Sequence, residues 1–458
     1  MLPEIFQAFI RESAVSVMVR GLMERMLNAE QMDEWFARTA EQQYTRELLF
    51  SSVLGLMVDV VCGVRSSLHR AYAAQSETIG VSLTSVYNKV NGIEPHTSAE
   101  LVRYSAEQGR SIIQALGVER ESLLPGYRVR MLDGNSIEAS QRRLKPLRGQ
   151  HSAPLPGKSL VVYEPALGLV TDEFPCEDGH AQERSLLADV LEQVSAGEAW
   201  VADRNFCTRD FLLGLEDRGA YFVIREHEGL RYEPTDEELR LCGRTQTGEV
   251  LEHSIELLDD QGCPRRWRRI VVKLDQPTRD DDRVIYILTN IPAEQADGCC
   301  IAEVYRQRWT IETAFQHLEQ NLNSEINTLG YPRAALFGFC VALVAYNVFA
   351  VVLAALRQVH GDQVVDESVS SYALAEELGT TYRGMMIAIP SEQWFCFREF
   401  SQQQLVEVLS QLAAAIRLSA FRKKRRGPKK STVKKKYDPK KPHVSTAKEL
   451  AAAKKSSP

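Results

Sequence analysis

Apolar residues recur at helical spacing at both ends of the chain and alternate like strands in its middle. Residues 1–120 show the helical spacing, so we predict a helical N-terminal domain that binds DNA. Within it, the stretch GVSLTSVYNKVNGIEP offers Ser82 or Thr84 as the cap of a short helix. This helix would be the second helix of a helix-turn-helix that presents Lys89 to DNA, or one half of an interdomain hairpin, and the sequence leaves both open.

From Tyr127 the apolar period changes to that of strands. The stretch YRVRMLDGNSIEA alternates and delivers Asp133 just before a glycine. Two strands follow in residues 159–178, and AWVADRNF then gives a short buried strand that ends on Asp203. We therefore predict the first part of an α/β core over residues 121–225.

Residues 226–288 contain several more strand patterns and form a predicted β-rich insertion. One of them, RRWRRIVVKL, places Arg266 and Arg268 on either side of Trp267. Cations beside an aromatic ring suit phosphates and an unstacked base, which makes all three candidate DNA contacts. The same pattern is typical of an edge strand that is protected by charge.

Helical spacing resumes in residues 289–360, predicted as the second part of the core, and continues through a helical C-terminal region at 361–420. Residues 334–356 contain no charged residue and are long enough to cross a membrane. Because no second span accompanies them, we expect a buried core helix and no membrane partner.

The stretch YRQRWTIETAFQHLE, residues 305–319, carries the most specific polar pattern. An advance of about 100° per residue along one helix places Tyr305, Arg308, Glu312 and Glu319 on one face, within roughly 60° of arc. Trp309 points elsewhere and is expected to anchor the helix in a core. One acid would thus be aimed into a site beside an arginine, although a solvated charged stripe has the same spacing.

Charge is distributed unevenly along the chain. The net charge of −6 combines +13 in residues 421–458 with −19 in the rest. Lysine-rich, proline-interrupted sequence of this kind predicts a basic disordered tail and a polyanionic partner. The candidate phosphate contacts in the tail are Arg422, Lys423, Lys424, Arg425 and Arg426.

The nine cysteines are scattered without paired CxxC spacing, which argues against a zinc ribbon and is typical of reduced thiols. No basic-then-apolar signal segment opens the chain, so we expect a cytoplasmic protein.

Three acids stand out by context: Asp133 after one strand, Asp203 after another, and Glu312 on a later helix. Carboxylates at strand ends on one edge of a sheet can converge with one from a helix to bind hard divalent cations. Two such ions about 4 Å apart can activate a water or a 3′-hydroxyl and stabilise the leaving oxygen of a phosphodiester. Taken singly, a strand-end aspartate is more often a turn former or a helix cap.

The motifs MLDGNSIE, VADRNF and YRQRWTIETAFQHLE together resemble those of DDE transposases of bacterial insertion sequences. The resemblance covers about residues 127–350 and is closest to the group with a Y-x2-R-x3-E-x6-K signature and a β-rich insertion. It implies that Asp133, Asp203 and Glu312 are catalytic and hold two Mg²⁺ ions, for which Mn²⁺ can substitute. Arg204 matches the second position of a D-R pair in this family.

The fold implied is α/β: an RNase H-like mixed-sheet catalytic core interrupted by a β-rich insertion, with a helical N-terminal domain and a helical C-terminal region. The resemblance further implies that Tyr305 and Arg308 contact phosphates near the transposon end. Some relatives form a DNA hairpin with a flipped base, for which Trp267 is the candidate receptor. The chain departs from the signature at Glu319, where lysine is usual.

The function implied is a DNA transposase that cleaves at the inverted repeats of its element, bacterial and nucleoid-associated, and joins the 3′-OH ends to target DNA. Its expected partners are the double-stranded DNA of the repeats and the target, and a second copy of the chain in a synaptic homodimer. A metal-dependent nuclease without strand transfer is one alternative. A domesticated DNA-binding regulator is the other.

Overall fold

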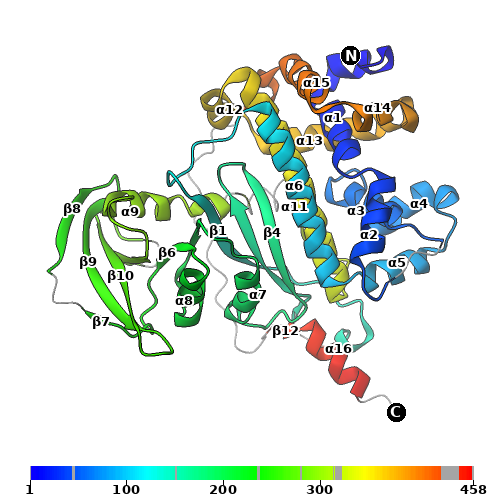
Figure 1. Ribbon diagram of the computed structural model, residues 1–458. Coiled ribbons are helices and arrows are strands. Elements are labelled where there is room, and N and C mark those ends of the chain that lie inside the picture. Colours follow the sequence, from blue (N-terminus) through cyan, green and yellow to red (C-terminus); the bar gives the residue numbers. More distant parts are fainter. Residues whose placement is uncertain are drawn as a thin grey trace.

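The protein is described by a computed structural model over residues 2–43, 47–149, 152–234, 238–278, 281–312, 314, 322–423 and 443–455. Figure 1 shows a large twisted sheet, with two long helices crossing it and a group of shorter helices beyond them. The strands are β1 (Arg128–Ser136), β2 (Pro154–Leu155), β3 (Lys158–Glu164), β4 (Leu169–Cys176), β5 (Glu198–Ala202), β6 (Tyr221–Arg225), β7 (Glu233–Pro234), β8 (Arg240–Arg244), β9 (Gly248–Leu258), β10 (Pro264–Leu274), β11 (Val284–Thr289) and β12 (Val444–Ser445).

Within the described residues, ten strands form one sheet in the order β4-β3-β1-β5-β6-β11-β10-β9-β7, with β8 paired to β9. The strands β4, β3 and β1 are antiparallel neighbours, whereas β1, β5 and β6 are parallel. With two antiparallel and two parallel pairings, the core sheet is mixed. The predicted α/β class and mixed sheet are therefore confirmed.

The insertion strands continue the core sheet. β11 pairs with β6, and β10 lies between β11 and β9, so its backbone is bonded on both sides. The interpretation of the arginine-rich strand β10 as an edge strand is therefore wrong. Its charged side chains have another explanation, given with the site below.

The N-terminal region is helical. Its helices are η1 (Glu4–Phe6), α1 (Gln7–Met26), α2 (Ala29–Thr39), α3 (Phe50–Val61), α4 (Leu68–Ile79), α5 (Leu83–Gly92) and α6 (Pro95–Leu116). Ser82 caps α5 by accepting a hydrogen bond from the backbone N–H of Ser85. The pair α4 and α5 keeps both interpretations open, a DNA-reading motif and a hairpin.

The helices associated with the core are η2 (Lys145–Leu147), η3 (Glu183–Leu186), α7 (Leu187–Glu192), η4 (Arg204–Phe206), α8 (Arg209–Asp217), α9 (Gly298–Arg306) and α11 (Pro332–His360). In the sheet, Met131 and Val201 face the side of α6 and α11, whereas Leu132 and Ala202 face the side of α7 and α8. Alternating strand residues thus fill two separate cores.

The apolar helix α11 lies inside the protein, with 89% of its most apolar window buried. It packs along α6 and against α3 and β4, as Figure 1 shows for the two long helices. Asn347 on α11 bonds both backbone groups of Val170 and the hydroxyl of Ser105. The expected core helix is confirmed, because the polar side chain that interrupts it is fully satisfied there.

The C-terminal helices are α12 (Asp362–Ser368), α13 (Ser371–Ala388), η5 (Ser391–Phe395), α14 (Cys396–Glu399), α15 (Gln402–Ala415), η6 (Leu418–Phe421) and α16 (Thr446–Lys455). The prediction of a fully disordered tail is wrong for residues 443–455. There β12 pairs with β2 in a second sheet, and α16 packs against η2. The physical reason is that backbone pairing and an ion pair between Lys448 and Asp178 hold this end on the core.

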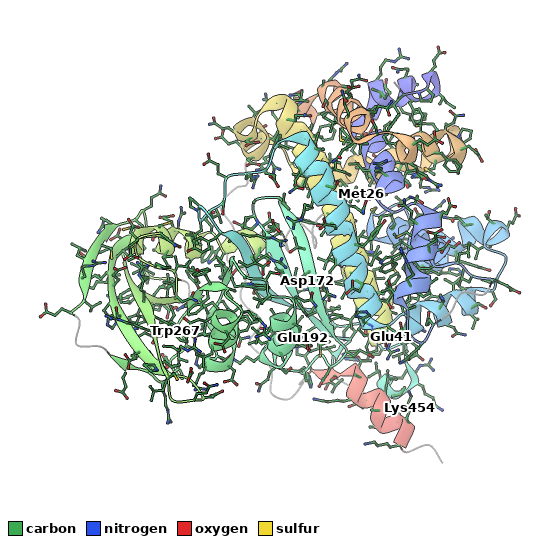
Figure 2. All side chains as sticks on the ribbon, in the orientation of Figure 1. Met26, Glu41, Asp172, Glu192, Trp267 and Lys454 are labelled. Carbon is green, nitrogen blue, oxygen red and sulfur yellow. The ribbon has the colours of Figure 1, made fainter. Side chains whose placement is uncertain are left out.

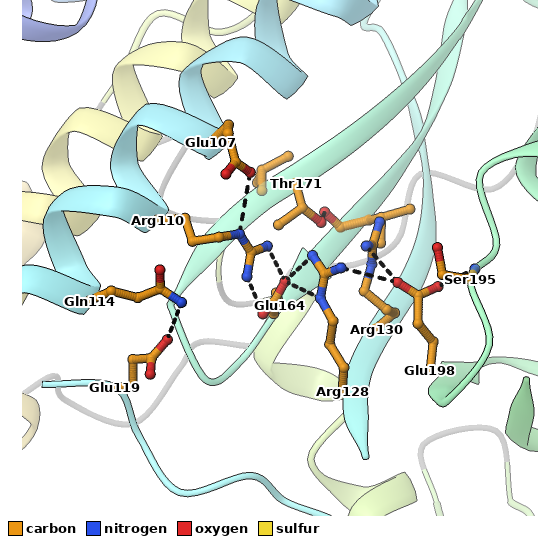
Figure 3. Close-up of polar contacts among 12 residues, drawn as sticks. Glu107, Arg110, Gln114, Glu119, Arg128, Arg130, Glu164, Thr171, Ser195 and Glu198 are labelled. Atoms are coloured by element: carbon orange, nitrogen blue, oxygen red, sulfur yellow. Dashed lines mark hydrogen bonds and ion pairs between the residues drawn. The ribbon is translucent and has the colours of Figure 1, made fainter. Parts of the chain in front are cut away.

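An ion-pair network joins α6 to three core strands (Figure 3). Glu164 on β3 accepts hydrogen bonds from Arg110 of α6 and Arg128 of β1. Glu198 on β5 accepts from Arg128 and from the buried Arg130. Removing one partner of such a buried pair costs about 3–5 kcal/mol, so the network fixes the strands that carry the candidate acids.

Candidate active site

Asp133 and Asp203 lie beside each other where the parallel pairing of β1 with β5 ends. Asp203 follows β5 as predicted, whereas Asp133 lies within β1, which continues to Ser136 because it stays paired with β3. Leu132 of β1 is in register with Ala202 of β5, and each aspartate is the next residue. The backbone of Asp203 is still extended, at φ −80° and ψ 179°. Adjacent strands lie about 4.8 Å apart, so both carboxylates leave the sheet at one edge.

The third acid, Glu312, lies on a short helical segment that a turn separates from α9. α9 ends at Arg306, Gln307 and Arg308 form a turn, and residues 309–312 are again helical. The predicted continuous helix over 305–319 is therefore wrong at this point. Trp309 is 58% exposed rather than anchored in the core, because the turn rotates the second segment. Glu319 lies outside the described residues.

The turn places Arg308 between two of the acids. Its Nη1 is 3.5 Å from Oδ2 of Asp133, and its Nη2 donates to Oε1 of Glu312 at 2.8 Å. Arg308 is only 8% exposed, and its Nε is buried with no hydrogen-bond partner in the described structure. A single guanidinium therefore holds Asp133 and Glu312 in one site.

Burial dominates the electrostatics of Asp133. It raises the pKa of this carboxyl to about 7, opposed by Arg308 and by the N–H of Gly134. The negative charges of Asp203 and Glu312 raise that pKa further. The three carboxylates therefore interact electrostatically, and their combined negative charge favours a cation beside them.

Asp203 has a second structural role. Its Oδ1 accepts a hydrogen bond from the backbone N–H of Asn205 at 2.7 Å and caps η4. The helix-cap interpretation and the catalytic one are compatible, because a carboxylate has two oxygens and several lone pairs. Arg204, the next residue, is exposed.

Tyr305 lies on α9 beside Arg308, with the guanidinium carbon 5.9 Å from its ring centre. It is buried, and burial raises the pKa of its phenol. In this structure Tyr305 supports Arg308 rather than facing solvent.

Sequence reasoning missed a fourth acid, Glu183. A Cβ at Gly134 would lie 2.4 Å from Oε1 of Glu183, so the glycine after Asp133 makes room for this carboxylate. The side-chain amide of Asn205 donates to Glu183, and Arg184 Nε donates to the Asn205 carbonyl. The available signal was the glycine itself, which permits a close approach but does not name the partner.

The prediction of Trp267 as a base receptor is wrong in placing this residue at the surface. It is 1% exposed, packs edge-on against Phe222 at 5.1 Å, and donates its indole N–H to Glu216 (Figure 2 labels it). Its strand alternates, and this position faces the core on the side of α8.

The neighbouring arginines of β10 are engaged by acids of the insertion. Arg268 pairs with Glu252 at 2.6 Å and donates to two backbone carbonyls, so it is not a free DNA contact. Arg266 is exposed and donates to the hydroxyl of Ser254 at 3.4 Å. The strand's positive charge is thus largely internal, which explains its composition without a sheet edge.

Lys89 is half-buried rather than presented outward. Its ammonium lies 4.4 Å from the ring centre of Phe36, and burial lowers its pKa. In the tail, Arg422 bridges to Val369, and the backbone N–H of Lys423 donates to the carbonyl of Ser368. Lys424, Arg425 and Arg426 lie outside the described residues.

The donor chemistry of the site suits a hard divalent cation, because three carboxylates contribute oxygen ligands around a buried, electronegative centre. Within the described residues, no three acidic, histidine or cysteine side chains are close enough to hold an ion. Arg308 lies between Asp133 and Glu312, and its positive charge balances theirs. The residues fit the expected ions in kind.

Comparison with known proteins finds a similarity for the part of the chain that contains the site. Residues 125–348, which contain all three acids, match a family described as "Transposase DDE domain". A cryo-EM structure of the piggyBac transposase synaptic complex with hairpin DNA is similar over 86% of each chain, at 11% sequence identity and a TM-score of 0.40. No curated protein matches the sequence. Over residues 125–348, 224 of its 458 residues, the chain is therefore similar to the transposase DDE domain family.

Proposed function

We propose that this transposase cleaves DNA at the ends of its element and joins the freed 3′-hydroxyls to target DNA. The observation that carries the proposal is that Arg308 contacts both Asp133 and Glu312, while Asp203 follows the strand residue paired with Leu132 and its charge acts on Asp133. An isolated charged stripe does not gather acids from two strands and a helix. A metal-dependent phosphoryl-transfer site does.

The residues would act by binding and orienting. Asp133 and Asp203 are fixed by the sheet register, whereas Glu312 lies on a short segment after a turn and is the more adjustable of the three. When Mg²⁺ ions are bound by these carboxylates, they supply the charge that activates the attacking oxygen and stabilises the leaving one. Arg308, released from the acids, would be free to meet a phosphate, a group that suits its planar fork.

The substrates we propose are double-stranded DNA of the element's ends and of the target, and the acting form is a homodimer that holds two ends. An acidic body needs localised positive surface for this. The region upstream of residue 421 carries a net charge of −19, so its overall charge repels DNA rather than attracting it.

One experiment separates this proposal from the nuclease and the regulator. The full chain is incubated with Mg²⁺, a target plasmid and a duplex that carries a pre-cleaved element end. The proposal expects covalent joining by the native protein and none by the Asp203→Asn variant. A parallel incubation with an intact end identifies the nuclease, which would cut that end while the pre-cleaved end is not joined. The regulator is expected to do neither.

A further inference from the structure

The arginine-rich insertion cannot supply the positive surface that a DNA complex needs. Arg265 is within ion-pair distance of Asp259, Asp217 and Glu216. Arg269 pairs with Glu226 at 2.6 Å, as Arg268 does with Glu252. Three of the four arginines of this strand are thus paired with nearby acids, so most of its positive charge is not available to DNA.

Two segments far apart in sequence come together to form such a surface. Residues 140–149 follow β1, and residues 443–455 contain β12 and α16. β12 pairs with β2, and α16 packs against η2 within the first segment. Figure 1 shows α16 beside this loop, and Figure 2 shows Lys454 on the outer side of the helix. We call these two segments together the basic ledge.

The basic ledge is strongly positive. Its two segments carry seven lysines and arginines and one carboxylate, Glu449. The exposed cations are Arg142, Arg143, Lys145, Arg148, Lys448, Lys454 and Lys455.

The acids around the basic ledge do not cancel its charge. Arg143 and Arg148 donate to neutral oxygens, and no carboxylate of the described residues is within ion-pair distance of Arg143, Lys145 or Arg148. At the border, Asp178 pairs with Lys448 at 2.9 Å and Glu177 pairs with Arg333 at 3.0 Å. Most of the positive charge therefore faces solvent.

The basic ledge is bonded to two neighbouring segments of the core and follows the strand that carries Asp133. The backbone of Ser140 bonds Pro154 of β2, while Gln141 bonds the carbonyl of Asn327, in the part that follows the Glu312 helix. Arg142 is nine residues from Asp133, so their Cα atoms are at most about 32 Å apart. One turn of B-DNA spans about 34 Å, so a duplex that reaches the acids can lie across these cations.

We propose that the basic ledge binds the phosphate backbone of the DNA duplex whose strand enters the site of Asp133, Asp203 and Glu312. This inference rests on the proposed function for the identity of the duplex. It gives the folded C-terminal segment a role, because β12 holds α16 on the core and α16 adds three lysines to the four cations of the loop. Recognition here is of phosphates and is independent of base sequence.

The test measures DNA binding as a function of salt in an Asp203→Asn background without Mg²⁺, so that no cleavage intervenes. The loop variant carries Arg143→Gln, Lys145→Gln and Arg148→Gln, and the helix variant carries Lys454→Gln and Lys455→Gln. The matched control carries Arg244→Gln and Lys273→Gln, two exposed cations of the insertion. Each protein is assayed with an element-end duplex and with an unrelated duplex of equal length.

Removing one cation that binds a phosphate lowers the slope of log K against log salt by about 0.9, so we expect decreases of up to about 2.7 for the loop variant and about 1.8 for the helix variant. Both duplexes should be affected alike, and the control should keep the native slope. Unfolding transitions are recorded for every variant to show that the fold is intact.

Folded variants with the native slope overturn the proposal, and so does an equal decrease in the control. The outcome is independent of the reaction. If the native protein fails to cut or join DNA while the slope falls in the two variants, the surface stands and the proposed function fails. If the native protein cuts and joins DNA while the slopes of the two variants are unchanged, the proposed function stands and the basic ledge does not bind the duplex.

Discussion

Replacing Arg308 by methionine removes the one cation that the structure places between two of the acids. Arg308 contacts Asp133 with side-chain exposures of 9% and 17%, whereas Glu312 is 44% exposed. Methionine keeps much of the length and the apolar stem but none of the charge. Asp133 then faces Asp203 and Glu312 without a counter-charge.

The size of the effect follows from these exposures. Breaking a buried ion pair by removing one partner costs roughly 3–5 kcal/mol, whereas the exposed Arg308–Glu312 pair is worth about 0.5 kcal/mol. Asp133 limits this cost by taking up a proton, since its pKa is already about 7. We expect a loss of about 3 kcal/mol at pH 8 and clearly less at pH 6.

The sign of the pH dependence is fixed by the direction of the shift. An acid whose pKa is raised in the folded state favours folding less as pH rises from its unfolded pKa to its folded one. The Arg308→Met variant raises the folded pKa of Asp133 further, so its stability falls more steeply towards pH 8 than that of the native protein.

The assay is urea unfolding at pH 6 and pH 8, with and without Mg²⁺. A bound ion stabilises the folded state by RT ln(1 + [Mg²⁺]/Kd). It should stabilise Arg308→Met more than the native protein, because in the native protein Arg308 competes with the ion for the acids. Arg308→Lys, which keeps the charge, is the control. Equal stability of the native and methionine proteins at pH 8, or an equal Mg²⁺ response, would refute the reasoning.

Three other changes have defined outcomes. Burial raises the pKa of Glu173 to about 8, so the free energy of unfolding of the native protein should fall by several kcal/mol between pH 5 and pH 8. Unfolding curves of Glu173→Gln should show a smaller fall. A parallel fall in both proteins would contradict this. Trp267→Ala should lower the free energy of unfolding by about 3–5 kcal/mol, measured by denaturation, because it leaves a cavity in the core. At temperatures where the variant is folded, its DNA affinity should equal that of the native protein. A loss of DNA affinity without a loss of stability would restore the base-receptor role. Glu164→Gln should lower the free energy of unfolding by about 2–3 kcal/mol, because it weakens the bonds to Arg110 and Arg128. The control Glu107→Gln, on the exposed side of the same network, should change it by less than about 0.5 kcal/mol. Equal losses in urea unfolding would show that burial is not the cause.

Local chemistry explains which parts of the site could be predicted from sequence. Asp133 and Asp203 each follow an apolar run of strand residues, and parallel neighbours bring such residues together whatever the loops between them do, although β1 continues beyond Asp133 to Ser136. The break at Gln307 and Arg308 left no trace in the pattern, because neither residue is a helix breaker. Trp309 was misplaced for that reason.

The errors at Trp267 and in the tail have different origins. Arginines around a tryptophan have the same composition whether they contact DNA or neighbouring acids, and only the pairing of β9 with β10 showed the acids. In the tail, composition outweighed a local signal: Thr446 and Glu449 have the spacing of a capping box, followed by alanines that favour helix. Glu183 was out of reach, since nothing in its own segment points to Gly134.

The most direct test of the central claim is single-turnover cleavage of a DNA duplex that carries the end of the element, in Mg²⁺, by the native protein and by Asp133→Asn, Asp203→Asn and Glu312→Gln. If the three acids form one metal-dependent site, the native protein cuts at the end and each variant is slower by roughly 10³-fold or more while it still binds the duplex. Cleavage at the native rate by any one of the three folded variants would contradict the account.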